Sequence, residues 1–463
     1  MYQIDFNHPI SVHFVGIGGI SMSGLAEILV DAGFQVSGSD RSESALTQAL
    51  ESKGINVFYG QRAENITETI DCAVFTSAIG NDNPEYIAVR EKNIPCLSRA
   101  ELLGQIMKNY DTPIAVSGTH GKTTTTSMVS EILLKAGCDP TLSLGGILKT
   151  IGGNVRVGGS QYFVAEACEY TNSFLSFFPK IGIILNIEED HLDFFKDLAD
   201  IRRSFRKFAD LLPEDGCLIV NNAIPNLGEI TVGLPCRIIT YGTNSEADYY
   251  SDSITCSEKG NSTFLVHSPT AEVQQFSLQV PGEHNVSNAL AAIALADLLS
   301  IPREITSAAI SRYTGTDRRF EYKGTIGGVT IIDDYAHHPT EITATLKAAA
   351  NTSHKRLWCV FQPHTYTRTK ALLKEFAEAL TLADKIVLAD IYPAREPVSL
   401  GVSLNISSEI LQREIQARGS ECWYFPTFDE IENFLLENCI NGDLLITMGA
   451  GDVVKIGEKL LGI

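Results

Sequence analysis

The chain has 463 residues, of which 44% are hydrophobic and 20% are charged. A chain of this length exceeds what a single hydrophobic core supports, so we expect two to four globular domains. The formal net charge of −20 argues against broad, sequence-independent binding of nucleic acid, which needs a positive surface.

The cysteines and the N-terminal residues bear on the cellular compartment. Ten cysteines occur without CxxC pairs or metal-type spacing, which is typical of reduced thiols and not of a disulfide framework. The first residues lack the charged and apolar regions of a signal peptide. No run of about 18 apolar residues is present. We therefore expect a cytoplasmic protein with neither nucleic acid nor membrane as a partner.

The first part of the chain alternates strand and helix patterns. An apolar strand pattern at 12–15 precedes a helical pattern at 22–32, and a second strand pattern at 34–37 leads to Asp40. Further strands are expected near residue 57 and at 74–76 and 95–97. Such alternation predicts a parallel sheet covered by helices.

The same rhythm restarts twice, which predicts a second and a third α/β unit. In the second, strands are expected at 113–116, 162–165 and 181–185, helices at 123–136 and 286–299, and antiparallel hairpins within 249–280. In the third, strands are expected at 329–332, 358–361, 385–388 and 444–447. We place the three units at 1–110, 111–314 and 315–463.

A glycine turn follows the first strand. It reads Gly16-Ile17-Gly18-Gly19-Ile20-Ser21 and resembles GxGxxG, with Ser21 at the third glycine position. Glycine lets a backbone approach a pyrophosphate at a helix N-terminus, where free N–H groups and the helix dipole favour anions. Asp40 lies where a dinucleotide fold places a ribose-binding acid. An ordinary strand–turn–helix junction explains the turn equally well, and a nicotinamide-dependent dehydrogenase stays an alternative here.

A second loop lies between a strand pattern and a helical pattern. Its Gly121-Lys122-Thr123 core matches the end of G-x-x-x-x-G-K-[ST], although Val116 replaces the first glycine. Backbone N–H groups in such a loop cradle phosphate oxygens, the lysine neutralises the β- and γ-phosphates, and the threonine hydroxyl holds Mg²⁺. We therefore predict that the loop binds a nucleoside triphosphate.

Two acidic clusters follow strand patterns of the second unit. One contains Glu166 and Glu169, and the other, at 186–193, contains four more acids and His191. Mg²⁺ prefers oxygen ligands and bridges phosphates. Helix capping explains Asp190 as well as metal binding does, but the clusters together with the loop predict a metal–ATP site.

Eight segments in chain order resemble the Mur ligases, which are ATP-dependent carboxylate–amine ligases of three domains. The segments are 16–24, 118–124, 186–193, 281–285, 317–321, 333–339, 361–369 and 448–452. The chain is most similar to the members that join L-alanine to the lactyl carboxylate of UDP-N-acetylmuramate through an acyl phosphate in peptidoglycan precursor synthesis. Members that attach a recycled tripeptide to the same UDP-sugar share nearly every motif and are the main alternative. A nucleotide-driven switch that forms no amide is the non-enzymatic alternative.

The resemblance implies an α/β fold and assigns a ligand to each domain. It implies a Rossmann-like UDP-binding domain, a central P-loop ATPase-like domain and a C-terminal Rossmann-like α/β domain that takes the amino acid, with ATP and Mg²⁺ as cofactors. The implied UDP-sugar site consists of Gly16, Ile17, Gly18, Gly19, Ile20, Ser21, Ser23 and Asp40. The implied ATP site consists of Gly118, Thr119, His120, Gly121, Lys122, Thr123, Thr124, His284, Asn285, Asn288, Arg319 and Asp334.

The resemblance also implies the reacting groups. Mg²⁺ is expected on Thr123, Glu166 and His191, and the incoming amino acid on His338, His364 and Arg368. The implied catalytic set is Lys122, Glu166, His191, His338 and His364, and either His338 or His364 is the expected base, because imidazole titrates near working pH.

Three positions depart from the family pattern. Gln61 stands in place of a histidine, Cys168 in place of an aspartate, and Thr365 in place of an arginine. The last difference gives Arg368 a larger share in recognising the amino-acid carboxylate. Several relatives carry a carbamylated lysine on the helix after the His191 segment; the matching residue is not identified here, so we make no prediction about that modification.

Overall fold

The computed structural model describes residues 2–76, 78–257, 260–269, 271–394 and 396–463. It divides into two compact units, and each is described by itself. Unit 1 consists of Met1–Ile187, Arg202–Thr240 and Ala294–Ile301. Unit 2 consists of Glu188–Ile201, Tyr241–Ile293 and Pro302–Ile463. None of the helices formed by the described residues has the length and apolar character that a membrane span requires.

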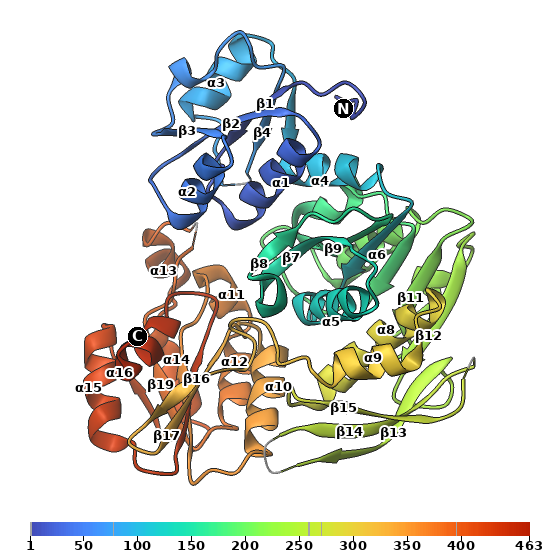
Figure 1. Cartoon of the computed structure of the whole chain (residues 1–463). Coiled ribbons are helices and arrows are strands. Elements are labelled where there is room, and N and C mark those ends of the chain that lie inside the picture. Colours follow the sequence, from blue (N-terminus) through green and yellow to red (C-terminus); the bar gives the residue numbers. More distant parts are fainter. Residues whose placement is uncertain (1, 77, 258–259, 270, 395) are drawn as a thin grey trace. The chain divides into compact units, whose positions relative to one another are not determined.

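Unit 1 begins with a parallel five-stranded sheet of order β3-β2-β1-β4-β5 (Figure 1). Its strands are β1 (Ser11–Val15), β2 (Gln35–Asp40), β3 (Asn56–Tyr59), β4 (Cys72–Phe75) and β5 (Cys96–Ser98). The connecting helices are α1 (Ile20–Asp31), α2 (Ala45–Ser52), η1 (Ala63–Asn65), α3 (Pro84–Glu91) and α4 (Arg99–Met107). The predicted strands and the first helix are confirmed within two residues at most ends, because short apolar runs bounded by turn residues specify them locally.

The second sheet of unit 1 has β6 at its centre. Its strands, in the order β12-β11-β10-β6-β9-β7-β8, are β12 (Arg237–Gly242), β11 (Cys217–Asn221), β10 (Ile181–Ile184), β6 (Thr112–Ser117), β9 (Tyr162–Ala167), β7 (Thr141–Leu148) and β8 (Gly153–Arg156). The register pairs Ser117 with Ala167 on one side and with Ile184 on the other. The carboxyl ends of β9, β6 and β10 therefore share one edge of the sheet.

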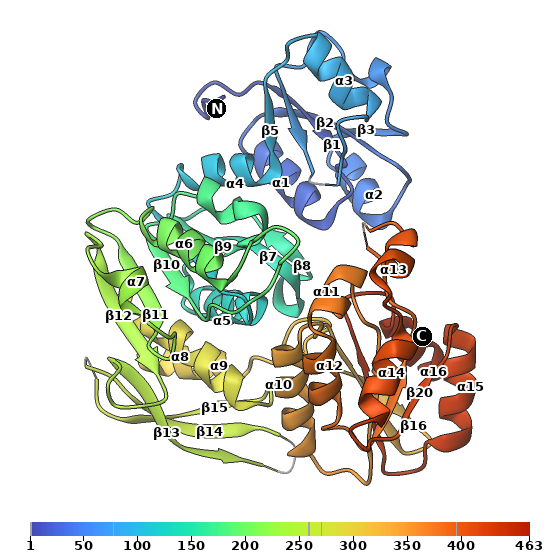
Figure 2. The same ribbon diagram turned by 180° about the vertical axis from the view of Figure 1, so that it is seen from behind.

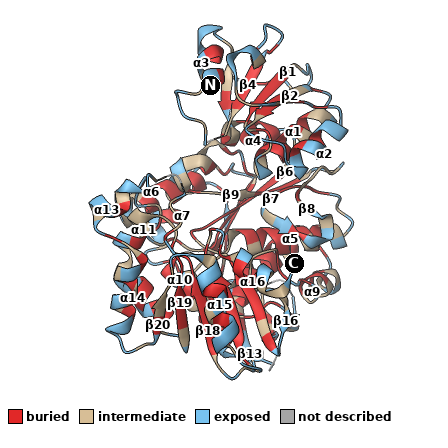
Figure 3. Cartoon of the chain, turned by 90° about the vertical axis from the view of Figure 1, so that its left-hand side faces the viewer, coloured by how far each residue is buried: buried red, intermediate tan, exposed pale blue. Residues whose placement is uncertain are grey.

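Helices connect these strands. They are α5 (Lys122–Lys135), η2 (Lys149–Ile151), η3 (Tyr170–Ser176), α6 (Leu198–Ala209) and α7 (Gly228–Thr231). β6 and β10 are buried along almost their whole length, as Figure 3 shows for β6, and they are largely apolar. Continuous apolar runs of this kind are typical of parallel strands covered on both faces.

Unit 2 contains an antiparallel arrangement of three strands. These are β13 (Tyr249–Cys256), β14 (Ser262–His267) and β15 (Gln274–Leu278), and β14 pairs antiparallel with both neighbours. The predicted hairpins are thus confirmed. The alanine-rich helix α8 (Glu283–Leu298) follows, and then α9 (Arg303–Ile310).

The third sheet lies wholly in unit 2 and has the order β16-β17-β21-β18-β19-β20. Only β16 pairs antiparallel. The strands are β16 (Glu321–Ile326), β17 (Val329–Asp334), β18 (Leu357–Phe361), β19 (Lys385–Leu388), β20 (Cys422–Tyr424) and β21 (Leu444–Met448). The helices are α10 (Pro339–Ala350), α11 (Tyr366–Ala371), α12 (Leu373–Leu380), α13 (Ser399–Leu404), α14 (Ser408–Gln416), α15 (Phe428–Asn438) and α16 (Val454–Leu461) (Figure 2).

Helices cover both faces of this sheet. Successive residues of a strand point to opposite faces, so Phe361 packs in a cluster with α10, α12 and α14, while Val360 packs in another with α15 and α16. The three sheets with their helices confirm the predicted α/β class.

Candidate active site

The glycine turn after β1 is held by backbone contacts that require glycine. The N–H groups of Gly16 and Ile17 donate to the Ser39 carbonyl at 2.8 and 2.9 Å. Gly16 has φ +85°, and a Cβ there would lie 2.6 Å from the Thr76 Cγ2. Any other residue at position 16 would therefore have a strained backbone conformation, and its side chain would clash with Thr76.

Asp40, at the end of β2, holds the turn from its other side. Its Oδ2 accepts the N–H of Gly18 at 2.8 Å. Helix α1 then begins after Gly19, which provides no side-chain cap. Ser21 and Ser23 lie in the first turn of α1, where backbone N–H groups and the helix dipole favour an anion. The residues predicted for the UDP-sugar thus lie together.

The loop between β6 and α5 is shaped by two glycines and an asparagine. Gly118 and Gly121 have φ +146° and +81°, and Gly121 is the N-cap of α5. Asn186 accepts the N–H of His120 at 2.7 Å and donates to the His120 carbonyl at 3.0 Å. An amide side chain that bonds both groups of one peptide residue fixes the loop against the end of β10, a role not predicted for Asn186.

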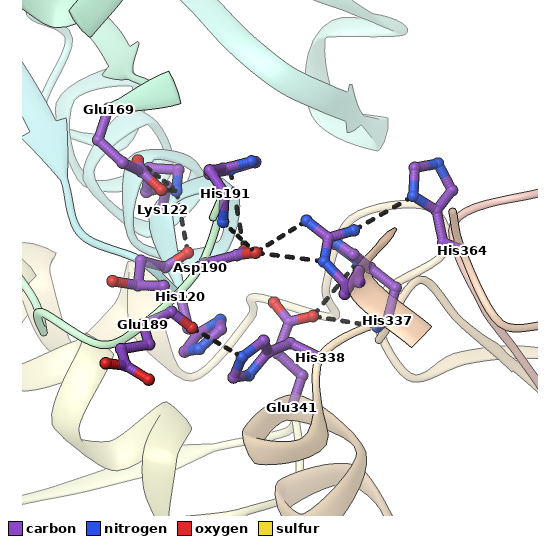
Figure 4. Close-up of polar contacts among 12 residues, drawn as sticks. His120, Lys122, Glu169, Glu189, Asp190, His191, His337, His338, Glu341 and His364 are labelled. Atoms are coloured by element: carbon purple, nitrogen blue, oxygen red, sulfur yellow. Dashed lines mark hydrogen bonds and ion pairs between the residues drawn. The ribbon is translucent and has the colours of Figure 1, made fainter. Parts of the chain in front are cut away.

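Lys122, the first residue of α5, points back into this loop. Its Nζ donates to the carbonyls of Gly118 and Thr119 at 2.5 and 3.0 Å, and it lies 3.0 Å from the Glu169 Oε2 (Figure 4). Burial lowers the pKa of Lys122, but the carboxylate of Glu169 raises it above its usual range. The ammonium is therefore charged at neutral pH and is held where a bound polyphosphate would meet it.

The next residue of α5 meets the second acidic side chain. The Thr123 hydroxyl donates to the Glu166 Oε2 at 2.7 Å, and the same oxygen accepts the Gly145 N–H at 3.1 Å. A Cβ at Gly145 would lie 2.3 Å from that oxygen, so glycine is needed for this contact. A hydroxyl and a carboxylate on one sheet edge form an oxygen-donor pair of the kind that suits Mg²⁺.

In unit 2, Asp190 forms an ion pair with Arg368 of α11. Its Oδ1 accepts from Arg368 at 2.8 Å from Nη2 and at 3.2 Å from Nε. Burial raises the pKa of Asp190, but the positive charge of Arg368, together with the neighbouring histidines, lowers it below its usual range, and the carboxyl is charged at neutral pH. His191 follows with φ +53°, and its Nε2 lies 3.8 Å from the Asp190 Oδ2.

His364 lies against the same guanidinium. Its Nδ1 lies 3.2 Å from Arg368 Nη1, which can only donate, and its ring stacks on Tyr392. Burial, with the neighbouring His337 and Arg368, lowers the pKa of His364 to about 3. The imidazole is therefore neutral at physiological pH.

His338 occupies the N-cap of α10. Its Nδ1 accepts the Thr340 N–H at 3.4 Å, so the proton is on Nε2, which donates to the Glu189 carbonyl at 3.0 Å (Figure 4). The adjacent His337 contacts Glu341, with Nδ1 3.4 Å from Oε2. Both nitrogens of His338 thus have partners.

The two arginines of the segment at 317–321 have different surroundings. Arg318 donates through Nε to the fully buried Asp333 at 2.9 Å and through Nη2 to the Gly449 carbonyl at 2.8 Å. Arg319 is 3.8 Å from the Glu341 carboxylate. Arg318 therefore forms a partly buried structural pair and does not serve as an exposed surface ion pair.

Asp334, at the end of β17, accepts two backbone N–H groups. Ala336 donates to Oδ1 at 2.7 Å and Phe320 to Oδ2 at 2.9 Å. Burial nevertheless raises the pKa of Asp334 to about 6. In this structure Asp334 shapes the loops around it.

Three of the residues predicted for ATP lie at the start of α8. Asn285 donates to the Pro281 carbonyl at 2.7 Å and accepts from Asn288 at 3.2 Å, and both asparagines are buried. His284 is exposed, and its ring packs on Gly282. The two asparagine side chains thus stabilise the first turn of α8 through these hydrogen bonds.

The predicted site residues therefore form groups within each unit. Unit 1 holds the glycine turn and, at the edge of the second sheet, the loop at 118–124 with Glu166. Unit 2 holds the residues predicted for the amino acid, with His191. Sequence reasoning missed the pairing of Lys122 with Glu169 and the position of His337. Two features of the sequence could have indicated these residues. Glu169 is a second acid close after Glu166, and His337 and His338 are adjacent histidines directly before Pro339.

Family models match nearly the whole chain. A "Mur ligase family, catalytic domain" model matches residues 11–111, a "Mur ligase middle domain" model matches 116–296, and a "Mur ligase, glutamate ligase domain" model matches 318–451. The UDP-N-acetylmuramate–L-alanine ligase of Agathobacter rectalis is 59% identical over 461 residues and covers 100% of both chains. That of Lachnospira eligens is 58% identical over 462 residues, again with 100% of both chains covered.

Solved structures agree. The UDP-N-acetylmuramate–alanine ligase of Thermotoga maritima superposes with a TM-score of 0.81 at 28% identity and covers 98% of both chains. A murein peptide ligase of Psychrobacter arcticus gives a TM-score of 0.72 at 26% identity with the same coverage. With three matched domain models and full-length identity far above 30%, the chain belongs to the Mur ligase family.

Proposed function

We propose that the protein uses ATP to join L-alanine to the lactyl carboxylate of UDP-N-acetylmuramate, forming UDP-N-acetylmuramoyl-L-alanine for peptidoglycan. The observation that carries this proposal is the 59% identity, over the full length of both chains, with a UDP-N-acetylmuramate–L-alanine ligase. The reaction belongs in the cytoplasm, where ATP is available, and a monomer or homodimer is expected.

The loop at 118–124 is the proposed site for the ATP phosphates. Gly118 and Gly121 keep the loop backbone close to the ligand, and Lys122 supplies a positive charge. Because Lys122 is bonded to Glu169 and to two loop carbonyls, it has to exchange some of these contacts for phosphate oxygens. Glu169 would then keep the lysine charged and directed along the loop.

Thr123 and Glu166 fit a magnesium ion. Both present oxygen at one point on the sheet edge, and magnesium prefers such ligands while keeping several waters. A magnesium ion bound there would withdraw electron density from phosphate oxygens and offset their charge. His191, the third predicted ligand, would come from the segment that carries Asp190.

The chemistry explains why a cation-lined phosphate site is needed. A carboxylate is a poor electrophile, so its oxygen attacks the γ-phosphorus, and ADP leaves with the electrons of the broken P–O bond. The amine of L-alanine then attacks the acyl phosphate and phosphate leaves. Lys122 reduces the repulsion between two anions during the first step, which is electrostatic stabilisation and positioning.

Arg368 and His364 are proposed to receive the amino acid. Arg368 would bind the carboxylate of L-alanine in exchange for part of its contact with Asp190. We assign the base role to His364 because its Nδ1 lone pair is held only by a side chain, whereas that of His338 caps the N-terminus of α10. The neutral form of His364 can accept a proton, but its pKa of about 3 lies far below the working pH on which the expectation rested, so the base role requires that bound substrate raise this pKa.

The test is release of phosphate from ATP with Mg²⁺ and UDP-N-acetylmuramate, with single amino acids and the tripeptide L-alanyl-γ-D-glutamyl-meso-diaminopimelate added separately. Release that depends on L-alanine, with the amide product identified by mass, is the expected result. Release only with the tripeptide would assign the chain to the recycling reaction. Nucleotide hydrolysis without any amide would contradict the ligase assignment.

A further inference from the structure

Glu396 is a partly buried acid between β19 and α13, outside the eight segments that resemble the Mur ligases. Its carboxylate reaches the start of α11, which lies 30 residues earlier in the chain. The Tyr366 N–H donates to its Oε2 at 2.5 Å and the Thr367 N–H donates to the same oxygen at 3.3 Å, while the Thr367 hydroxyl donates to Oε1. The first N–H groups of a helix have no partner within it. A distant carboxylate therefore caps α11, at the end where the helix dipole favours negative charge.

The start of α11 needs this support because its N-cap residue has an unfavourable backbone conformation. Thr365 has φ +65°, in the left-handed region that a β-branched residue rarely adopts. Its N–H donates to the Tyr392 carbonyl at 2.9 Å, and its hydroxyl accepts the Arg368 N–H at 3.4 Å. A strained conformation of this kind persists only where the surrounding contacts fix it. Tyr392 and Glu396 supply such contacts.

The two groups proposed to receive the amino acid lie on either side of this strained residue. His364 directly precedes Thr365, and Arg368 lies in the first turn of α11 that follows it. His364 forms a β-bridge with Tyr392 and stacks on its ring, whereas Arg368 donates to Asp190. A change of backbone conformation at Thr365 would therefore turn His364 and Arg368 relative to each other.

Helix α13 supports the same turn of α11 by packing. The two helices contact each other, and both are labelled in Figure 2. Gly401 of α13 lies against the ring of Tyr366, so that a Cβ at Gly401 would be only 2.7 Å from the Tyr366 Cε1. The part of the chain that follows β19 thus holds α11 in two ways: the Glu396 carboxylate bonds its N-terminus, and α13 packs on its first residue.

We propose that Glu396 is a positioning residue for the amino-acid site: by capping α11 it directs Arg368 and His364 toward the incoming L-alanine. The proposal rests on the proposed function, because it assumes that these two residues receive the amino acid. Nε and Nη2 of Arg368 are bonded to Asp190, so the direction of its remaining donor depends on how α11 is held. A displacement of about 1 Å at a positioning group can lower turnover by about 100-fold.

The experiment measures initial rates of phosphate release by the full chain with ATP, Mg²⁺, UDP-N-acetylmuramate and L-alanine, with one substrate varied at a time. It compares the wild type with Glu396→Ala, which removes the cap, and with Glu396→Gln, which keeps one carbonyl oxygen as an acceptor. Glu409→Gln is the matched control, because Glu409 is an exposed glutamate in the first turn of α14. Thermal unfolding shows whether each variant is folded.

We expect Glu396→Ala to raise the KM for L-alanine by about 10- to 100-fold, as when a hydrogen bond to a charged group is lost. The KM values for ATP and the UDP-sugar should change by less than about threefold, because their proposed sites do not depend on α11. Glu396→Gln should lie between Glu396→Ala and the wild type, since it keeps an acceptor without the charge. Glu409→Gln should have the wild-type KM for all three substrates.

A double variant tests whether Glu396 acts through Arg368. Arg368→Met should itself raise the KM for L-alanine, because it removes the proposed partner of the carboxylate. Adding Glu396→Ala to Arg368→Met should then raise this KM by less than about threefold more, because residues that act through one another do not have additive effects.

Three results would overturn the inference. An unchanged KM for L-alanine in folded Glu396→Ala would show that the cap does not direct the amino-acid site, and Glu396→Gln decides the same point if Glu396→Ala does not fold. Equal increases in KM for all three substrates would assign Glu396 a general structural role. Effects that multiply in the double variant would mean that Glu396 does not act through Arg368. A wild type without L-alanine-dependent release would instead contradict the proposed function, and this inference with it.

Discussion

Replacing either partner of the Lys122–Glu169 pair should destabilise the edge of the second sheet, and the two effects should not add. The nitrogen and oxygen are 3.0 Å apart, and the side chains are 13% and 2% exposed. With an effective dielectric constant of about 20, this separation corresponds to an attraction of about 5.5 kcal/mol. The cost of removing both ions from water offsets much of it, so the pair itself contributes less.

The single variants differ in what they leave behind. Lys122→Met leaves the buried Glu169 carboxylate without its cation and should cost about 3–5 kcal/mol. Glu169→Gln leaves a lysine that still donates to the carbonyls of Gly118 and Thr119, so a loss of about 1–3 kcal/mol is expected. The double variant should lose at least about 2 kcal/mol less than the sum, because neither charge is then left without the other.

The assay has to report on this edge alone. Native-state hydrogen exchange of peptides from residues 112–135 follows β6 and α5 directly. Fluorescence of the two tryptophans, Trp358 and Trp423, serves as the control because both lie in unit 2. Losses that add within about 0.5 kcal/mol would refute the reasoning, since they would mean that the two charges do not depend on each other.

Three further predictions concern other parts of the site. Gly145→Ala should displace the Glu166 carboxylate and raise the Mg²⁺ concentration needed for half-maximal activity by about 10-fold; an unchanged Mg²⁺ requirement would contradict the contact. Because the pKa of His364 falls from 6.5 in the unfolded chain to about 3, its neutral form stabilises the fold above about pH 6.5, and that contribution is lost as the pH falls toward 3. His364→Gln should therefore flatten the rise of the urea midpoint between pH 4 and pH 7, and an unchanged slope would exclude His364 as its source. Arg368→Met should remove the main cation beside the buried Asp190 carboxylate and lower the stability of unit 2 by about 3–5 kcal/mol, measured by tryptophan fluorescence in urea; a loss below about 1 kcal/mol would mean that the pair is solvated.

Much of the fold could be predicted from the sequence because its signals are local. A run such as 113–116, followed by glycines and then by helix-forming residues, specifies a strand, a loop and a helix within a few residues of chain, and β6 and α5 are found there. The alternating pattern between residues 249 and 280 likewise predicts hairpins. The domain boundaries at 1–110, 111–314 and 315–463 stay a prediction, as do the ligand roles of the site residues.

The pairing of side chains could not be predicted in this way. Lys122 meets Glu169 because β6 and β9 pair with Ser117 opposite Ala167, which brings two segments 47 residues apart to one edge. Thr367 and Glu396 are 29 residues apart, and Arg368 and Asp190 are 178 apart. No local pattern encodes such partners.

The sequence by itself determined which groups can carry the chemistry: the glycines that allow positive φ, the lysine after the loop, and the carboxylates after the strands. Only the tertiary structure decided which of these groups meet and which are already bonded, as when His338 caps α10 while His364 faces Arg368. The physical reason is that backbone conformation follows from neighbouring residues, whereas contacts, burial and pKa values depend on sheet register and on packing between distant segments.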